Sequence, residues 1–132
     1  MNALRRALYL QAAAWGVGGA ALAVAPRFVL VTLFDQPAGQ ELAWERVLGV
    51  QAVGLAMLMV LVAHRVEELW WWSWAFALAA EGTAAIALLH AGFGLAPGQS
   101  SVLWWVLAGT AGLFSVGLLY GLLAASREQP AP

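Results

Sequence analysis

Residues 102–125 read VLWWVLAGTAGLFSVGLLYGLLAA, an apolar stretch without a charged side chain. About 20 such residues form a helix long enough to cross roughly 30 Å of hydrocarbon. Three earlier stretches share this character, at about residues 7–25, 47–63 and 69–89. All four are apolar on every side, unlike the one-sided helices of soluble proteins. The sequence therefore predicts an all-α fold, an integral membrane bundle of four transmembrane helices that forms one domain over residues 1–132.

The composition of the chain agrees with this fold. Of its 132 residues, 63% are hydrophobic and 10% are charged, and the mean hydropathy is +0.79. A soluble domain carries about 25% charged residues to cover its surface. The net charge of −1 and the absence of a basic stripe disfavour a nucleic-acid partner. We therefore expect the lipid bilayer to surround the chain and no nucleic acid to bind it.

The placement of arginine predicts how the helices cross the membrane, because cytoplasmic loops carry an excess of basic residues. With a cytoplasmic N-terminus, the inner side holds more arginines than the outer side: Arg5, Arg6, Arg65 and Arg127 against Arg27 and Arg46. The absence of lysine and the abundance of alanine favour a bacterial source. We predict a multi-pass protein of the bacterial inner membrane with both termini in the cytoplasm. The alternative, a signal peptide cleaved after residue 25, is disfavoured by the length of the first apolar run and by Pro26.

Six tryptophans mark the predicted ends of the spans. They are Trp70, Trp71 and Trp72 on the inner side and Trp44, Trp104 and Trp105 on the outer side. Indole rings prefer the headgroup level of a bilayer, so we expect these residues to be interfacial anchors. The alternative is that Trp70–Trp72, together with Trp74, offers a stacking surface for a quinone or a pigment.

Residues 26–45 join the first two spans and contain a segment that is too short to cross. Pro26 suits the first position of a helix, and about nine mainly apolar residues follow it. The sequence DQPAG at 35–39 then interrupts the helix. We predict a short helix in the outer interface over this segment. The alternative is that the first helix continues to Phe34 with a kink at Pro26.

Glu81 is the one acidic residue deep inside a predicted span. It lies about twelve positions into the third span, roughly 18 Å from its start and near the bilayer midplane. An ionised side chain costs roughly 3 kcal/mol at that depth, so we expect Glu81 to face the bundle and to be paired or protonated. Thr110 lies at a similar depth in the fourth span and is the predicted hydrogen-bond partner, with Ser115 as a further candidate.

The remaining signals in the sequence are weaker. His64 falls at the inner end of the second span and His90 at the outer end of the third, so one subunit cannot bring both to a single haem iron. The spacing Gly117-x-x-x-Gly121 fits a small-residue packing motif between membrane helices. The sequence contains no P-loop and no HExxH motif. We expect no metal, no cofactor and no enzymatic activity.

The layout resembles the DoxX-like family of small four-helix bacterial membrane proteins. The resemblance is carried by APRF at 25–28, LF at 33–34, and RVLG at 46–49, which opens the next helix. It implies a four-helix membrane fold and, for a few members, an association with membrane redox complexes, but it carries over no site residues. Small multidrug-resistance transporters also have four helices and a membrane glutamate. Their glutamate lies in the first helix, whereas residues 7–25 of this chain contain no acidic side chain.

Three functions stay open on the sequence. The first is a non-catalytic membrane subunit or interaction partner, which packs against another membrane protein or a second copy of itself. The second is a proton-coupled transporter of small molecules centred on Glu81. The third is a quinone-linked redox component that uses the tryptophan-rich inner face.

Overall fold

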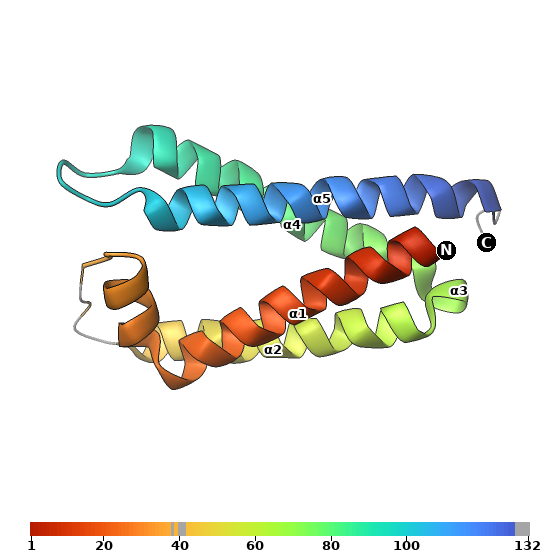
Figure 1. Ribbon diagram of the computed structural model, residues 1–132, viewed down its shortest axis with the longest axis horizontal. Helices are drawn as coiled ribbons and strands as arrows, with labels where there is room; N and C mark the ends of the chain where they lie inside the picture. The colour runs from red at the N-terminus through yellow and green to blue at the C-terminus, as the bar shows by residue number, and fades with distance from the viewer. Residues whose placement is uncertain (38, 40–41, 129–132) are drawn as a thin grey trace.

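The computed structural model describes residues 1–37, 39 and 42–128, and within this part of the chain all the regular structure is helical, without strands. Four helices are long and apolar enough to cross a membrane, which confirms the predicted four-helix fold (Figure 1). The main elements are α1 (Asn2–Val24), α2 (Ala43–His64), α4 (Ser73–Leu89) and α5 (Val102–Glu128). The short elements are η1 (Phe28–Leu33), α3 (Val66–Leu69), η2 (Trp70–Trp72) and η3 (His90–Gly94).

The helices extend beyond the apolar stretches that predicted them. The third span was expected over residues 69–89, and the structure forms a helical run over Val66–Gly94. Within this run, α3 and the tight turn η2 precede α4, and a π-helical turn, η3, follows it. Hydropathy predicts only the part of a helix that suits hydrocarbon, whereas backbone hydrogen bonding continues into polar flanks.

The four long helices form two antiparallel hairpins, α1 with α2 and α4 with α5 (Figure 1). The hairpins meet mainly through α1 and α5, whereas α2 and α4 scarcely touch. They are closest at the end that holds the N-terminus, α3 and the C-terminal part of α5, and they diverge toward η1 (Figure 1). The open ends of the two hairpins, away from their connecting loops, therefore lie at the same end of the molecule. The arginines predicted on the inner side belong to this end.

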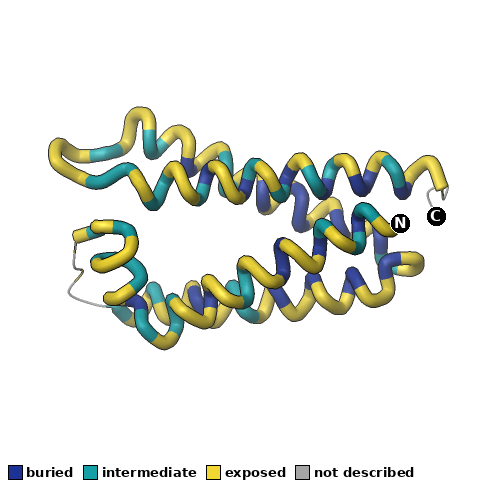
Figure 2. The backbone as a smooth tube through the Cα atoms, viewed as in Figure 1, coloured by how far each residue is buried: buried dark blue, intermediate teal, exposed yellow. Residues whose placement is uncertain are grey.

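The core occupies the half of the bundle where the hairpins converge. Fully buried apolar side chains come from every long helix or its flank, and they include Leu4, Leu8, Met59, Val66, Ala77, Leu118 and Leu122. Figure 2 shows most of the buried positions toward the end that holds the termini. The two hairpins are therefore joined by one shared core at this end, and elsewhere each hairpin is held by its own helix pair.

The α1–α2 hairpin contains a very close backbone contact at its other end. A Cβ atom added at Gly49 would lie 2.5 Å from both the Ala23 nitrogen and the Gly19 carbonyl oxygen. A Cβ added at Gly19 would lie 2.7 Å from the Gly49 carbonyl oxygen. Only glycine at both positions permits this approach, which is the usual way that helices pack closely in lipid.

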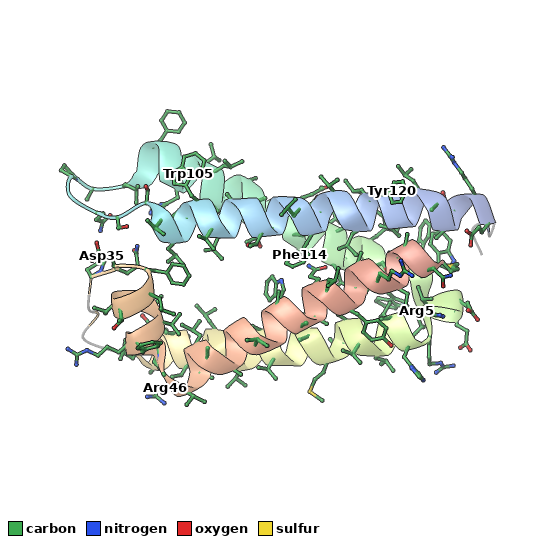
Figure 3. The ribbon with its side chains drawn as sticks, viewed as in Figure 1. Arg5, Asp35, Arg46, Trp105, Phe114 and Tyr120 are labelled. Carbon is green, nitrogen blue, oxygen red and sulfur yellow. The ribbon has the colours of Figure 1, made fainter. Side chains whose placement is uncertain are left out.

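Two arginines tie the ends of the same hairpin together. Arg5 of α1 donates from Nε to the Ala63 carbonyl of α2, at 3.2 Å. Arg46 of α2 donates to the Ala23 carbonyl of α1, at 3.3 Å. Figure 3 shows Arg5 and Arg46 at opposite ends of the hairpin. Each arginine therefore satisfies a carbonyl in the last turn of the neighbouring helix, where intrahelical donors are missing.

A short helix follows α1, as the sequence predicts. The α-helix ends at Val24, Pro26 is buried, and η1 is a separate π-helix, so the alternative of one continuous helix to Phe34 is wrong. Gln36 then donates from Nε2 to the carbonyl of Ser100, at 3.1 Å, and so links this segment to the loop before α5. Residues 38, 40 and 41 of the predicted interfacial segment lie outside the described residues.

Candidate functional site

Glu81 lies on α4, midway along the helical run Val66–Gly94. Its nearest polar partner is Ser115 of α5, whose hydroxyl donates to Oε1 over 3.4 Å. Ser115 itself is only 7% exposed, because its side of α5 packs against α4. Glu81 as a residue is exposed, although its carboxyl reaches the hydroxyl of Ser115 on the neighbouring helix.

Thr110, the predicted partner, does not meet Glu81. Its hydroxyl donates to the Val106 carbonyl of its own helix, at 2.7 Å, and its side chain is exposed. Thr110 and Ser115 are five positions apart, which turns the two side chains to different sides of α5. Counting residues gives a position along the helix, but it does not say which side of the helix faces a neighbour.

Glu81 is the midpoint of a line of exposed side chains that we call the α4 stripe: Trp74, Leu78, Glu81, Ala85 and Leu88. Their spacing alternates between four and three residues, so the five lie on one side of the helix. A different side of α4, which includes Ala80 and Ala87, is buried against the rest of the chain. The α4 stripe is therefore mainly apolar, and its one acidic residue accepts a hydrogen bond from α5.

Two buried polar side chains of the core lack a hydrogen-bond partner among the described residues. Gln11 of α1 is 0% exposed, and neither its amide nitrogen nor its amide oxygen has a hydrogen-bond partner among the described residues. The hydroxyl of Ser73, at the start of α4, is likewise buried and unpartnered within the described part of the chain. A buried amide without partners destabilises a fold by its full desolvation penalty, so Gln11 is a weak point of the core.

Charged side chains join three elements at the end where the hairpins converge. The N-terminal amine of Met1 lies 2.8 Å from Glu128 Oε2, which joins α1 to α5. Arg5 pairs with Glu67 of α3 at 3.1 Å, in addition to its bond to α2. Arg65 and Glu68 form a further pair on the exposed surface. These contacts are structural ties and not a convergent site, because each carboxylate meets one cation at the exposed rim.

The predicted tryptophan anchors have two different environments. Trp70 is only 5% exposed and belongs to the core, where its ring meets Trp71 edge-on at 5.3 Å between centroids. Consecutive residues in a tight helical turn point in different directions, so three neighbouring indoles cannot all face outward. The exposed members are Trp44, Trp71, Trp72 and Trp105. Trp104 is partly buried, and its ring packs against His90 at 4.1 Å between centroids.

The predicted packing glycines lie where the two hairpins meet. A Cβ atom added at Gly121 would come within 2.7 Å of the Leu4 Cα atom, so α1 and α5 touch backbone to backbone there. A Cβ added at Gly117 would lie 3.8 Å from the Ala7 side chain, an ordinary contact distance. Gly121 is therefore the residue of this pair on which the close approach depends.

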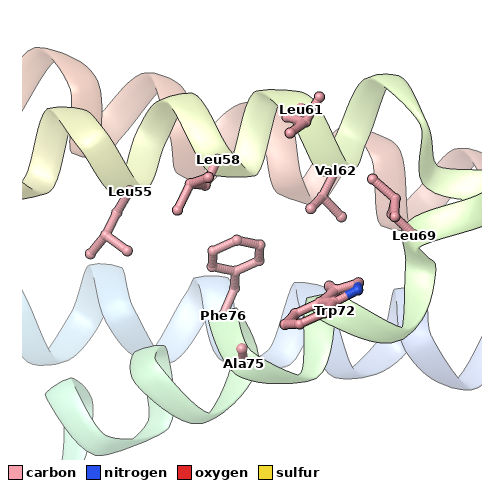
Figure 4. Close-up of a pocket in the computed structure, with 8 residues that line it drawn as sticks. All are labelled: Leu55, Leu58, Leu61, Val62, Leu69, Trp72, Ala75 and Phe76. Carbon is pink, nitrogen blue, oxygen red and sulfur yellow. The ribbon is translucent and has the colours of Figure 1, made fainter.

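A groove of about 450 Å³ runs between the two hairpins where α2 and α4 fail to pack (Figure 4). Its walls are apolar, and they are formed by Leu55, Leu58, Leu61, Val62, Leu69, Trp72, Ala75 and Phe76. Among the described residues, no group of three or more His, Asp or Glu side chains is placed to hold a metal ion. The groove therefore offers hydrocarbon contact and no converging reactive groups.

Comparison with models of known protein families, with curated proteins and with solved structures finds no match. No relative supplies residue roles for this chain. Its function must therefore be argued from Glu81, the α4 stripe and the arrangement of the four helices.

Proposed function

We propose that this chain is a multi-pass protein of the bacterial inner membrane and a non-catalytic subunit, which works by packing against another polypeptide in the bilayer. Large apolar side chains are exposed along all four long helices, a surface that suits lipid and not water. The single observation that carries the subunit role is the exposure of Glu81 within the apolar α4 stripe.

The proposed orientation follows from the charges at the two ends of the bundle. Arg5, Arg6 and Arg65 belong to the end that also holds the N-terminus, and Arg127 is in the last turn of α5 at the same end. Arg27 and Arg46 belong to the other end. Since cytoplasmic segments are the more basic ones, this distribution supports a cytoplasmic location for both termini.

The subunit role follows from the cost of leaving Glu81 in lipid. A charged side chain near the bilayer centre costs roughly 3 kcal/mol by insertion scales. The hydroxyl of Ser115 supplies one long hydrogen bond to one carboxyl oxygen, whereas a carboxylate accepts several. Another chain that covers the α4 stripe would remove Glu81 from lipid and add the missing partners.

Photo-crosslinking in native membranes tests this proposal. A benzophenone amino acid replaces Leu78 in the α4 stripe, and a matched variant carries it at Leu113, which is highly exposed on α5. We expect a polypeptide adduct from position 78 and mainly lipid adducts from position 113. Lipid adducts alone from both positions would contradict the subunit role, as would transport by the purified protein alone in liposomes.

A proton-coupled carrier is the second candidate, and the contact between Glu81 and Ser115 is the observation that favours it. In this mechanism the Glu81 carboxyl would exchange a proton for a cation. Uptake of tetraphenylphosphonium into proteoliposomes is the test, and Glu81→Gln is expected to abolish it while leaving expression unchanged. Uptake at the wild-type rate in Glu81→Gln would rule the carrier out. Membership of the DoxX-like family, and a quinone-linked role, stay predictions from the sequence.

A further inference from the structure

We propose that the chain binds an anionic phospholipid of the inner leaflet in a groove between α1 and α5. This second groove has a volume of about 410 Å³ and follows the joint between the two hairpins. The inference goes beyond the subunit role. It rests on the membrane location and the cytoplasmic N-terminus that the proposed function includes.

The shape of the groove suits an acyl chain. Small residues of both helices line its middle, where a Cβ atom added at Gly117 would lie 3.8 Å from the Ala7 side chain. Leu10 and Phe114 form its deeper end, and Figure 3 shows Tyr120 nearer than Phe114 to the end of the bundle that holds both termini. The six positions from Phe114 to Tyr120 span about 9 Å of helix, more than half of the roughly 15 Å of hydrocarbon in one leaflet. The groove therefore runs from the inner interface toward the bilayer centre.

The polar groups of the groove lie at its inner end. Tyr120 precedes Gly121, which touches the backbone of Leu4, so Tyr120 lies level with the first turns of α1. Arg6 lines the groove from these same turns. Arginine and tyrosine both place their polar tips at the headgroup level while their apolar parts lie along hydrocarbon. The groove is therefore polar at one end and apolar along its length, which is the polarity of a phospholipid.

The charge of Arg6 favours an anionic headgroup. Arg5 pairs with Glu67 and Arg65 pairs with Glu68, whereas Arg6 has no carboxylate partner among the described residues. A guanidinium binds a phosphate through two parallel hydrogen bonds. Phosphatidylglycerol would neutralise Arg6, whereas phosphatidylethanolamine brings an ammonium group that already balances its own phosphate. The site therefore favours phosphatidylglycerol.

Native mass spectrometry tests the headgroup preference. The purified chain is titrated separately with phosphatidylglycerol and with phosphatidylethanolamine, as wild type, Arg6→Gln and Arg127→Gln. Arg127 is the matched control, because it lies in the last turn of α5 at the same end of the bundle but does not line the groove. We expect wild type to retain phosphatidylglycerol more tightly than phosphatidylethanolamine. Arg6→Gln is expected to bind phosphatidylglycerol about 5-fold more weakly, and Arg127→Gln is expected to bind it like wild type.

Photo-labelling in vesicles tests the position of the acyl chain. Phosphatidylglycerol with a diazirine in its acyl chain is compared with phosphatidylcholine that carries the same diazirine, and the adducts are mapped by proteolysis and mass spectrometry. Leu123 is the control, since it is exposed on α5 but does not line the groove. We expect phosphatidylglycerol adducts to exceed phosphatidylcholine adducts at Leu10 and Phe114 and to equal them at Leu123.

Several results would overturn the lipid site. Unchanged binding in Arg6→Gln, or equal losses in Arg6→Gln and Arg127→Gln, would leave only a general attraction to surface charge. Equal enrichment at Leu123 would show that the lipid is not held in the groove. A polypeptide adduct in place of lipid from a benzophenone at Leu113, which also lines the groove, would show that a protein fills it. These results leave the membrane location intact, whereas release of the chain from membranes by alkaline carbonate would contradict that location itself.

Discussion

At the scale of single residues, Gln11 and Glu81 have opposite surroundings. Gln11 is fully buried without a hydrogen-bond partner among the described residues, and Glu81 is exposed beside one hydroxyl. In water the exposed glutamate would be favourable, because carboxylates favour the surface, and only the buried amide without a partner would be unfavourable. In a bilayer both placements are unfavourable. A neighbouring chain could cover Glu81 and supply further hydrogen-bond partners.

Replacement of Gln11 by methionine is expected to stabilise the fold by about 1 kcal/mol, because it removes an unpartnered amide from the core at similar volume. Gln51→Met is the control, since Gln51 is exposed on α2. The free energy of unfolding, measured by steric trapping in bicelles, is expected to rise for Gln11→Met and to stay within about 0.5 kcal/mol for the control. A loss of stability in Gln11→Met would show that the amide makes a favourable native contact.

The sequence predicts Glu81 as a candidate because a lone acid interrupts a long apolar run. Its partner could not be predicted in the same way, since counting residues gives depth but not the side of the helix. Thr110 and Ser115 both lie at about the right position along the fourth span, and only the packing of α4 against α5 selects Ser115. The burial of Trp70 was missed for a related reason, because composition alone treats three consecutive indoles as equivalent.

At the scale of elements, glycine positions decide how closely helices approach, and the structure separates essential glycines from tolerant ones on the same helix. Gly49 faces the backbone of α1, whereas a Cβ added at Gly54 meets no atom within 4 Å. Gly121 faces the backbone of Leu4, whereas Gly117 has room for a methyl group. Each close glycine therefore has a matched control nearby.

Gly49→Ala is expected to lower the free energy of unfolding by about 1–3 kcal/mol, because its methyl group overlaps the α1 backbone and forces the helices apart. Gly54→Ala is expected to be neutral or to stabilise by up to about 1 kcal/mol, through the better helix propensity of alanine. Steric trapping measures both variants. Equal stability of the two would contradict the close crossing of α1 and α2.

Gly121→Ala is expected to weaken the joint between the hairpins and to leave each hairpin intact, because Leu4 and Gly121 are in backbone contact. Hydrogen exchange is the measurement, with faster exchange expected in the first turns of α1 and the last turns of α5. In the Gly117→Ala variant, the amide hydrogens of these turns are expected to exchange at the wild-type rate. Unchanged exchange in Gly121→Ala would show that α1 and α5 do not meet at this point.

At the scale of the whole molecule, the number of long helices is predictable from hydropathy, and their arrangement is not. Helices that are apolar on every side carry no face that indicates their neighbour, so the pairing of α1 with α2 and of α4 with α5 is a result of the structure. The close contact of Gly19 with Gly49 and the reciprocal bonds of Arg5 and Arg46 identify the first pair only in retrospect. The α2–α4 groove has no sequence signal for the same reason.

Labelling in intact bacteria tests the orientation of the whole bundle. Gln99→Cys places a thiol in the exposed loop between η3 and α5, and Ser126→Cys places one in the last turns of α5. A membrane-impermeant maleimide is expected to label position 99 in intact cells and position 126 only after permeabilisation, because the basic end is proposed to face the cytoplasm. The opposite labelling pattern would contradict the proposed cytoplasmic location of the two termini.

The measurement that tests the central claim most directly is oxygen accessibility of spin labels in the bilayer. One label is attached at Ala85→Cys in the α4 stripe and one at Leu113→Cys on α5, in separate samples. The account predicts an immobile label shielded from oxygen at position 85 and a mobile, oxygen-accessible label at position 113. Equal mobility and equal oxygen accessibility at both positions would show that lipid, and not another chain, covers Glu81.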